Sequence, residues 1–267
     1  MLKKLSILSV ALASIVGVSA AQSPPSPAPT QVRNIVLVHG AFADGSSYAK
    51  VIPLLQAQGF RVTAVQNPLS SLADDVAAIR RALALQDGPV ILVGHSWGGM
   101  SVSEAGNDPK VVGLVYIAAI VPDAGQTAND VLKPYPQTPG LGHMTPDASG
   151  YLSLTRQGIE EDFVPDLPAR ERALVFATQG PWNSAGLAEV VPNPAWKTRP
   201  SWFIAVNDRI LPADYELAIA KTINAKLTRL ASGHVPMLSR PKDVAAVIVD
   251  AANTAGSRDA GTKTSNR

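Results

Sequence analysis

The stretch Val90-Ile-Leu-Val-Gly-His-Ser-Trp-Gly-Gly99 decides the fold of this chain. An apolar run over residues 89–93 is typical of a buried strand, and residues 97–104 continue with a composition that favours a helix. Between them lies Gly-x-Ser-x-Gly, which in this strand-turn-helix context predicts a nucleophile elbow. The turn lifts the hydroxyl of Ser96 clear of the sheet. Both glycines of the pattern are expected, because a Cβ atom at either place would collide with the crossing strand and helix.

On either side of the elbow, strand-like and helix-like segments alternate. Further strands are predicted for residues 33–38, 60–65, 111–118, 201–206 and 225–230. Helices are predicted for residues 48–58, 72–85, 213–221 and 241–252, and Asp74 and Asp75 lie in the first turn of one of them. Such alternation specifies an α/β fold, with a mostly parallel central sheet and helices on both faces.

The alternation stops between about residues 121 and 198. This stretch is rich in proline and has only short helical segments, such as 169–177. It is too long for a plain loop, so we expect a cap inserted over the sheet. The predicted organisation is one domain over residues 32–255, followed by a flexible polar tail over residues 256–267.

The first 31 residues predict export. Lys3 and Lys4 precede an apolar stretch over residues 5–18, and small residues follow, which is the pattern of a signal peptide over residues 1–20. A permanent membrane anchor is the alternative, but the apolar stretch is short for a bilayer. Prolines make residues 21–31 an extended linker. We therefore expect a periplasmic or extracellular protein without a membrane span.

Composition narrows the class of protein. The chain has 267 residues, of which 46% are hydrophobic, enough for one domain with a sizeable core. The formal net charge is +2. The sequence has no basic patch of the kind that would indicate nucleic acid as a partner. There is no cysteine and the four histidines are scattered, so we predict neither a disulfide, nor a metal site, nor an organic cofactor.

A serine hydroxyl needs a neighbouring base, and His234 is the candidate that elimination leaves. His95 adjoins Ser96, so its side chain points in another direction. His39 lies beside a glycine after the first predicted strand, where it is expected to shape the loop. His143 lies in the proline-rich insert, where a role at the surface or within the cap is expected. His234 directly follows the last predicted strand, at the sheet edge where functional groups gather.

The base in turn needs an acid that holds its tautomer and stabilises the imidazolium. Asp208 follows a predicted strand and lies in a turn, which can aim its carboxylate at a neighbouring loop. Asp214 is the competitor, but it looks like a first-turn helix residue with a structural role. We therefore predict Asp208 as the acid.

The oxyanion of an acyl-transfer reaction needs two backbone N–H donors. We assign one to Trp97, directly after the serine. The other is assigned to Ala41 in the loop after the first strand, with Phe42 as the alternative. Candidates for an apolar substrate pocket are Phe42, Trp97, Trp182 and Trp196. Packing within the cap explains Trp97 equally well and is the favoured alternative for the other three.

As a set, these stretches resemble the α/β-hydrolase fold superfamily, and more narrowly the small esterase and hydroxynitrile lyase group that includes plant methylesterases. The motifs are VLVHGAF (36–42), VIPLL (51–55), GFRVTA (59–64), LVGHSWGGM (92–100), NDRILP (207–212) and GH (233–234). The resemblance covers about residues 32–252 and is weakest across the cap. It implies the same triad and the same oxyanion donors as the residues selected above, in the chain order serine, aspartate, histidine.

Two departures bear on the reaction. The lyases of this group carry a threonine where this chain has Gly40, and a lysine where it has Val235. That lysine supplies positive charge for a leaving cyanide, so its absence favours ester hydrolysis. Trp97 replaces a leucine that is frequent in the plant members, and we expect it to narrow the acyl pocket.

The sequence therefore predicts a secreted serine hydrolase of the carboxylesterase type that cleaves small, largely apolar esters through an acyl-enzyme. A lactonase, a C–C hydrolase or lyase and a perhydrolase are alternatives, because fold and triad do not fix the substrate. A non-catalytic ligand-binding protein of the same fold is a further alternative. A nucleotide-binding domain is disfavoured, since residues 39–45 lack Gly-x-Gly-x-x-Gly. The expected partner is a small-molecule ester, and the sequence specifies neither the natural substrate nor the oligomeric state.

Overall fold

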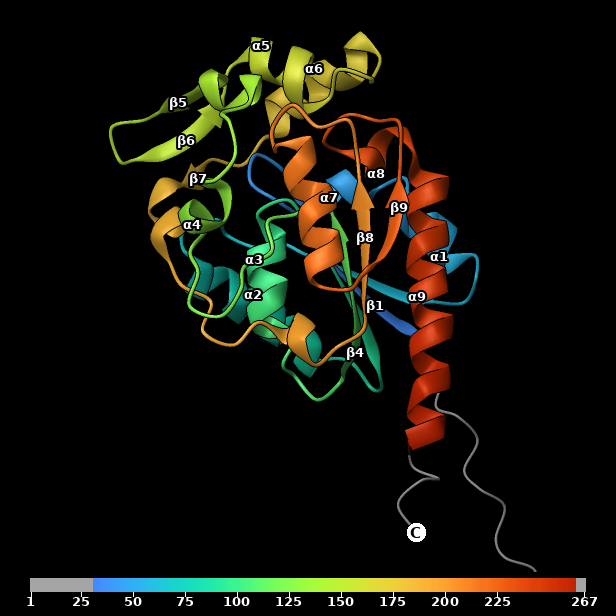
Figure 1. Ribbon diagram of the computed structural model, residues 1–267. Helices are drawn as coiled ribbons and strands as arrows, with labels where there is room; N and C mark the ends of the chain where they lie inside the picture. Colours follow the sequence, from blue (N-terminus) through green and yellow to red (C-terminus); the bar gives the residue numbers. More distant parts are fainter. Residues whose placement is uncertain (1–30, 263–267) are drawn as a thin grey trace, which may run out of the picture.

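A six-stranded sheet forms the centre of the computed structural model, which describes residues 31–262 (Figure 1). Its strands are β1 (Asn34–Val38), β2 (Arg61–Val65), β3 (Val90–His95), β4 (Val111–Ile117), β8 (Ser201–Ala205) and β9 (Lys226–Arg229). They lie in the order β2-β1-β3-β4-β8-β9, and every neighbouring pair is parallel. The predicted parallel α/β architecture is confirmed.

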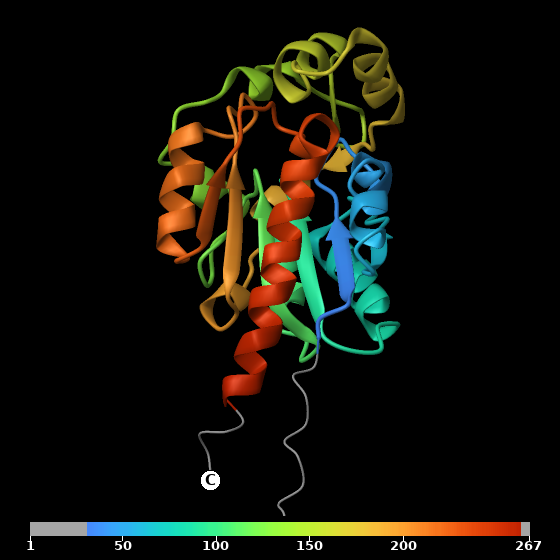
Figure 2. The ribbon, with the colours of Figure 1, turned by 90° about the vertical axis from the view of Figure 1, so that its right-hand side faces the viewer.

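Helices cover both faces of this sheet (Figures 1 and 2). Outside the cap they are η1 (Gly45–Tyr48), α1 (Ile52–Gln56), α2 (Leu72–Ala84), α3 (Gly98–Ala105), α7 (Ala213–Thr222), α8 (Pro236–Ser239) and α9 (Pro241–Thr262). Helix α9 packs against α1 and crosses β3, β4 and β8 on one face. Helices α2 and α3 pack against each other on the opposite face, where α3 contacts β3. The parallel strands are therefore shielded from solvent on both sides.

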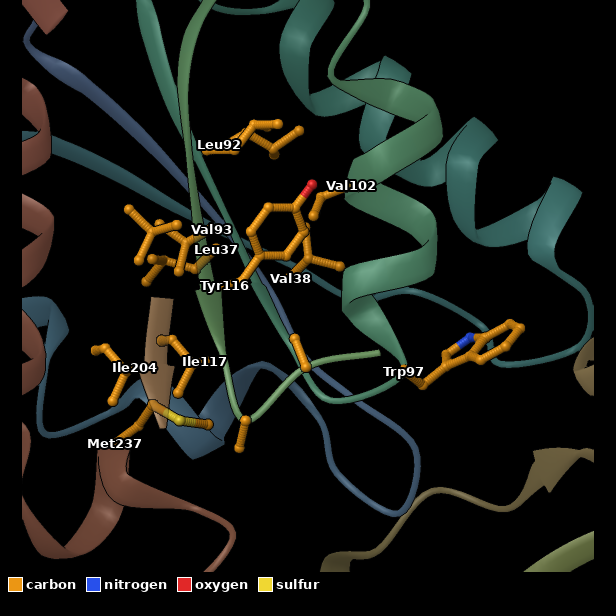
Figure 3. Close-up of a cluster of buried hydrophobic side chains, with 14 of the residues drawn as sticks. Leu37, Val38, Leu92, Val93, Trp97, Val102, Tyr116, Ile117, Ile204 and Met237 are labelled. Carbon is orange, nitrogen blue, oxygen red and sulfur yellow. The ribbon is translucent and has the colours of Figure 1, made fainter. Parts of the chain in front are cut away.

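Continuous apolar strands explain why the sheet is buried. Every residue of β1, β3 and β8 is buried, as expected for a parallel sheet between two helical layers. Figure 3 shows how successive side chains alternate between the faces: Tyr116 lies beside Val102 of α3, whereas Ile117 lies on the other side with Met237. The Tyr116 hydroxyl is 3.0 Å from Oγ of Ser103, so its polar end has a partner within the core.

Between β4 and β8 the chain forms an insert, of which α5, α6, β5 and β6 lie over the carboxyl ends of the strands (Figure 1). Its elements are α4 (Ala128–Leu132), η2 (Pro139–His143), β5 (Met144–Pro146), β6 (Tyr151–Leu154), α5 (Arg156–Gly158), η3 (Ile159–Phe163), α6 (Ala169–Thr178), β7 (Trp182–Asn183), η4 (Ser184–Ala188) and η5 (Ala195–Lys197). Strands β5, β6 and β7 pair antiparallel in a small sheet that the sequence did not predict. We call residues 121–198 the cap.

Two predicted elements have different bounds. The single helix predicted over residues 48–58 is divided, because η1 ends at Tyr48 and α1 begins at Ile52 with Pro53 in its first turn. Proline has no backbone N–H to donate to a preceding turn, so it favours a new helix start. Helix α9 extends to Thr262, so residues 256–262, which were expected in the polar tail, are helical. No proline interrupts them, and each added helical residue gains a backbone hydrogen bond.

Some predictions concern residues that the structure does not describe. The proposed signal peptide, all but the last residue of the linker and residues 263–267 lie outside the described range. Among the helices of residues 31–262, none combines the length and apolar character that a membrane crossing requires.

Candidate active site

The elbow places Ser96 directly after β3 in a left-handed backbone conformation, with φ of 53°. A non-glycine residue adopts this conformation only where its surroundings hold it there. The backbone N–H of Ser96 donates to Ile117 O at 3.0 Å, and its carbonyl accepts from the N–H of Ile120 at 3.1 Å. A Cβ atom on Gly98 would lie 2.8 Å from His39 O, so glycine is needed where α3 passes β1. The turn is therefore fixed on both sides.

Three side chains from distant parts of the chain meet at this turn. Nε2 of His234 lies 2.8 Å from Oγ of Ser96, and Nδ1 of His234 lies 2.5 Å from Oδ2 of Asp208. They follow β3, β9 and β8, so the shared carboxyl edge of these strands brings them together. If Nδ1 donates to the carboxylate, Nε2 is left free to accept the serine proton.

The surroundings keep Asp208 ionised. Burial opposes its charge, but the neighbouring His234 and hydrogen bonds from His234, Glu216 and the N–H of Ile210 outweigh burial and hold the pKa of Asp208 below its ordinary value. The N–H of Ile210 lies 2.6 Å from Oδ1. Since the side chains of Asp208 and His234 are both fully buried, solvent does not compete for their hydrogen bond.

The side chains of His39 and His95 form hydrogen bonds with backbone groups of the loops around the site. His95 donates from Nε2 to the carbonyl of His234 at 2.9 Å, and burial lowers the pKa of His95 to about 3, so it stays neutral. His39 donates from Nδ1 to Gly40 O at 2.9 Å and accepts from the N–H of Asn67 at 3.2 Å. Both rings hold loops of the site. Within residues 31–262, no cluster of three or more His, Asp or Glu side chains is arranged to hold a metal ion.

The loop after β1 approaches Ser96 closely. A Cβ atom on Gly40 would lie 2.5 Å from the Cβ of Ser96, so residue 40 has no room for a side chain such as threonine. Ala41 follows, and Phe42 has φ of 59°. On the other side, Trp97 precedes α3, whose amino end carries partial positive charge. The assignment of the N–H groups of Ala41 and Trp97 as oxyanion donors stays a prediction.

Aromatic rings lie next to the elbow and to His234. The Phe42 ring lies edge-on to Phe163 and to Trp182, with centroid distances of 6.4 and 6.0 Å. Trp182 lies 5.0 Å from Trp97, and Phe163 lies 5.3 Å from His234. The structure thus brings Phe42 and Trp182, both predicted from sequence, into contact with each other, and it adds Phe163 from the cap as the ring that lies against His234.

A buried carboxyl fixes the Trp97 indole. Oδ2 of Asp75 accepts from Nε1 of Trp97 at 2.7 Å, and Oδ1 accepts from the N–H of Leu69 at 2.8 Å. Burial raises the pKa of Asp75 above its ordinary value. The sequence showed Asp75 only as a first-turn helix residue, and nothing in its local pattern indicated an indole partner.

Trp196 lies outside the site, which corrects its assignment to the pocket. Its Nε1 donates to Pro122 O at 2.8 Å. Together with Trp202 and Lys226 it lines a hollow at the amino ends of β8 and β9, the edge of the sheet opposite Ser96. The reason is topological, because η5 returns the chain from the cap to the start of β8 and packs against α3.

Two carboxylates of the cap hold the loops that carry Asp208 and His234. Asp162 is fully buried; its Oδ1 accepts from Nε of Arg209 at 2.7 Å, and its Oδ2 lies 2.6 Å from Nδ1 of His143. Oδ2 of Asp166 accepts from the N–H of Gly233 at 2.9 Å. In the sequence these aspartates belong to an acidic stretch typical of a solvated segment, so their roles were missed.

An apolar cavity of about 290 Å³ lies between cap helix α6 and the core. Phe42, Phe163 and Val235 line it on the side of the candidate site, and Leu174 and Val175 line it from α6. It is therefore adjacent to the aromatic rings that surround Ser96.

Comparisons with known proteins agree with this architecture. The sequence profile described as the Alpha/beta hydrolase family matches residues 35–247. This chain belongs to the alpha/beta hydrolase family. Pyrethroid hydrolase of Sphingobium wenxiniae is 28% identical, over 83% of this chain and 88% of that protein. Methylesterase 7 of Arabidopsis thaliana is 25% identical, over 83% and 96%. Alpha-hydroxynitrile lyase of the same plant is 27% identical, over 78% and 93%.

Solved structures of the family superpose on most of this chain. The crystal structure of a pyrethroid hydrolase from Sphingobium faniae is 26% identical, has a TM-score of 0.72, and covers 83% of this chain and 98% of that one. Polyneuridine aldehyde esterase, at 21% identity and a TM-score of 0.69 over 82% and 99%, shares the fold. The predicted α/β-hydrolase fold and the resemblance to the esterase and hydroxynitrile lyase group are confirmed. Hydrolases and esterases are among the relatives of this chain.

Proposed function

We propose that this protein is a serine hydrolase that cleaves carboxylic esters of small, largely apolar molecules. The continuous contact from Oγ of Ser96 through His234 to Asp208 carries the proposal. His234 takes the serine proton as Oγ attacks the ester carbonyl, and then gives it to the departing alcohol. Water deprotonated by His234 hydrolyses the acyl-enzyme and regenerates Ser96.

The backbone N–H groups of Ala41 and Trp97 stabilise the oxyanion in both steps of this mechanism. Their segments lie against Ser96, and the amino end of α3 adds favourable partial charge. Loss of one such donor typically raises the barrier by about 3 kcal/mol. Because these donors belong to tightly packed backbone, they need no rearrangement when charge develops on the substrate.

An apolar substrate is supported by what surrounds the serine. The aromatic rings and the adjacent cavity offer apolar surface to the acyl or alcohol part of an ester. Val235 follows His234 and carries no charge that would stabilise a departing cyanide. The closed space at Gly40 likewise disfavours the lyase reaction in this site.

The deciding experiment compares the wild-type protein with Ser96→Ala on aryl esters, methyl esters, lactones and a cyanohydrin. We expect the variant to lose about 10⁶-fold in kcat on esters, with its thermal unfolding unchanged. Ser101→Ala is the matched control, since Ser101 is a buried serine of α3, the helix after Ser96, and its Oγ has no hydrogen bond to the triad. Equal rates for wild type and Ser96→Ala would overturn the proposal, and turnover of the cyanohydrin alone would favour the lyase.

We further propose that the protein is exported and loses its first 20 or 21 residues. The support is the amino-terminal sequence, in which a basic start, an apolar stretch and small residues succeed one another. Amino-terminal sequencing of the protein recovered outside the cytoplasm tests this. A mature protein that still begins at Met1 would contradict it.

A further inference from the structure

A second carboxyl lies buried behind the candidate acid. Glu216 lies in the first turns of α7, and its side chain is fully buried. Its Oε2 accepts from the N–H of Val206 at 2.8 Å, which fixes the side chain at the end of β8. Its carboxyl lies beside that of Asp208, close enough for the two groups to share a hydrogen bond if one of them carries a proton. Two acidic groups therefore share one site that is closed to bulk solvent.

The chemistry of this pair requires a proton. If both groups were ionised, Oε1 of Glu216 would be buried with no donor among the described residues. Two carboxylates cannot hydrogen-bond each other, and neighbouring like charges in a buried site cannot both persist. A single proton between Glu216 and Asp208 removes the repulsion and supplies the missing donor.

The other contacts decide which carboxyl keeps the proton. Asp208 receives hydrogen bonds from His234 and from the N–H of Ile210, both of which favour its charged form. Among residues 31–262, only the N–H of Val206 donates to Glu216. Burial, followed by the charge of Asp208, raises the pKa of Glu216 well above its ordinary value. The proton therefore resides on Glu216 at neutral pH.

We propose that Glu216 is a neutral carboxylic acid that donates a hydrogen bond to Asp208 and positions it for His234. The inference rests on the proposed function, in which Asp208 orients the base. A neutral donor leaves one negative charge beside the imidazole. A second charge, or the loss of the donor, would favour the imidazolium, the form of His234 that cannot take the proton of Ser96.

The ionisable groups around Glu216 are few. Asp208 faces it from the loop after β8, with His234 behind that carboxylate, and Tyr215 lies beside it on α7. The Tyr215 hydroxyl donates to Ala119 O at 3.2 Å, and burial raises its pKa, so it stays neutral. If substitution of Glu216 shifts the acidic limb of the pH profile of kcat/KM (the acid limb), the shift therefore reports on the Asp208–His234 pair.

Two substitutions separate positioning from a merely structural tie between α7 and β8. Glu216→Gln keeps an acceptor for Val206 and offers an amide donor to Asp208, so kcat/KM stays within about threefold of wild type and its acid limb is unmoved. Glu216→Leu fills similar space without a donor, so we expect kcat/KM at neutral pH to fall about 10- to 100-fold. Its acid limb moves to higher pH. A loss of activity without movement of the limb would overturn the proposal.

Infrared difference spectroscopy tests the proton without turnover. The wild-type protein minus Glu216→Gln should show the carbonyl stretch of a neutral carboxylic acid at neutral pH. Asp214→Asn is the matched control, because it removes an exposed carboxyl from the same turn and should leave that band in place. Absence of the band from the difference spectrum would overturn the proposal, even if Glu216→Leu fails to fold.

The activity measurements and the infrared spectra also distinguish a failure of this inference from a failure of the proposed function. If wild type and Ser96→Ala hydrolyse esters equally, the function fails, while the infrared band still decides the state of Glu216. If Ser96→Ala is inactive but the band is missing and the acid limb is unmoved, only the role of Glu216 fails.

Discussion

Helices α3 and α6 have similar lengths but are packed in opposite ways. Seven of the eight residues of α3 are buried, whereas none of the ten residues of α6 is. Helix α3 follows Ser96 directly, and α6 covers the apolar cavity and leaves Leu174 63% exposed. Ser96 is therefore followed by a tightly packed helix, whereas the cavity is bounded by a helix with no buried residue.

The cap nevertheless contacts the site at defined points. Asp162 binds Arg209, the neighbour of Asp208, and Asp166 binds the backbone before His234. Phe163 between them lies against the His234 ring. We infer that the segment around η3 belongs functionally with the core, and that α6 does not.

The largest loss of kcat is expected from a substitution in the core of the site, Asp208→Asn. The amide cannot hold the productive tautomer of His234, so kcat should fall by about 10⁴-fold while the fold is retained. Steady-state ester hydrolysis and thermal unfolding measure this. Asp214→Asn is the control on α7, and a loss smaller than tenfold would show that Asp208 does not act as the acid.

Asp162→Asn tests the contact between cap and core. Weakening the bond to Arg209 should let the Asp208 loop shift, and a displacement of about 1 Å can cost on the order of 100-fold in rate. We expect a loss of about 10- to 100-fold in kcat on every ester. Glu160→Gln, a more exposed carboxyl of the same segment, should change kcat less than twofold. Equal changes in kcat for Asp162→Asn and Glu160→Gln would show that the contact between η3 and Arg209 does not matter for activity.

His95→Gln should alter how stability depends on pH. The folded state keeps His95 neutral down to about pH 3, whereas the unfolded chain binds the proton near 6.5, so stability falls as pH falls below 6.5. At about 1.4 kcal/mol per pH unit, His95 contributes a loss of roughly 2 kcal/mol between pH 6.5 and pH 5. Urea unfolding at both pH values should show that loss reduced by this amount in the variant. An unchanged difference would contradict a neutral His95.

Val102→Ala and Leu174→Ala compare the two helices directly. Val102 is fully buried in α3, so its truncation should lower the free energy of unfolding by about 2 kcal/mol. Leu174 is exposed on α6, and its truncation should change stability by less than about 0.5 kcal/mol. Similar losses for both would mean that α6 is as tightly held as α3.

Local sequence patterns predicted the core well because strands and the elbow depend on short-range rules. The apolar run before Ser96 and the glycines around it required a strand, a sharp turn and a helix, and the structure contains them. The helix predicted over residues 48–58 is confirmed only for Ile52–Gln56, since η1 ends at Tyr48 and Pro53 lies in the first turn of α1. The cap could not be predicted in detail, since its short elements acquire their form from contacts with one another.

The amino-acid sequence by itself determined the order of strands and helices, the position of Ser96 at the elbow and the candidates Asp208 and His234, since each lies where a predicted strand ends. Only the tertiary structure decided which side chain each buried carboxyl has as its partner. Asp75 with Trp97, Asp162 with Arg209 and Glu216 with Asp208 are pairs whose local sequence resembles ordinary helix or surface positions. Their roles arise from burial and from partners on other elements, and such proximity exists only after the chain has folded.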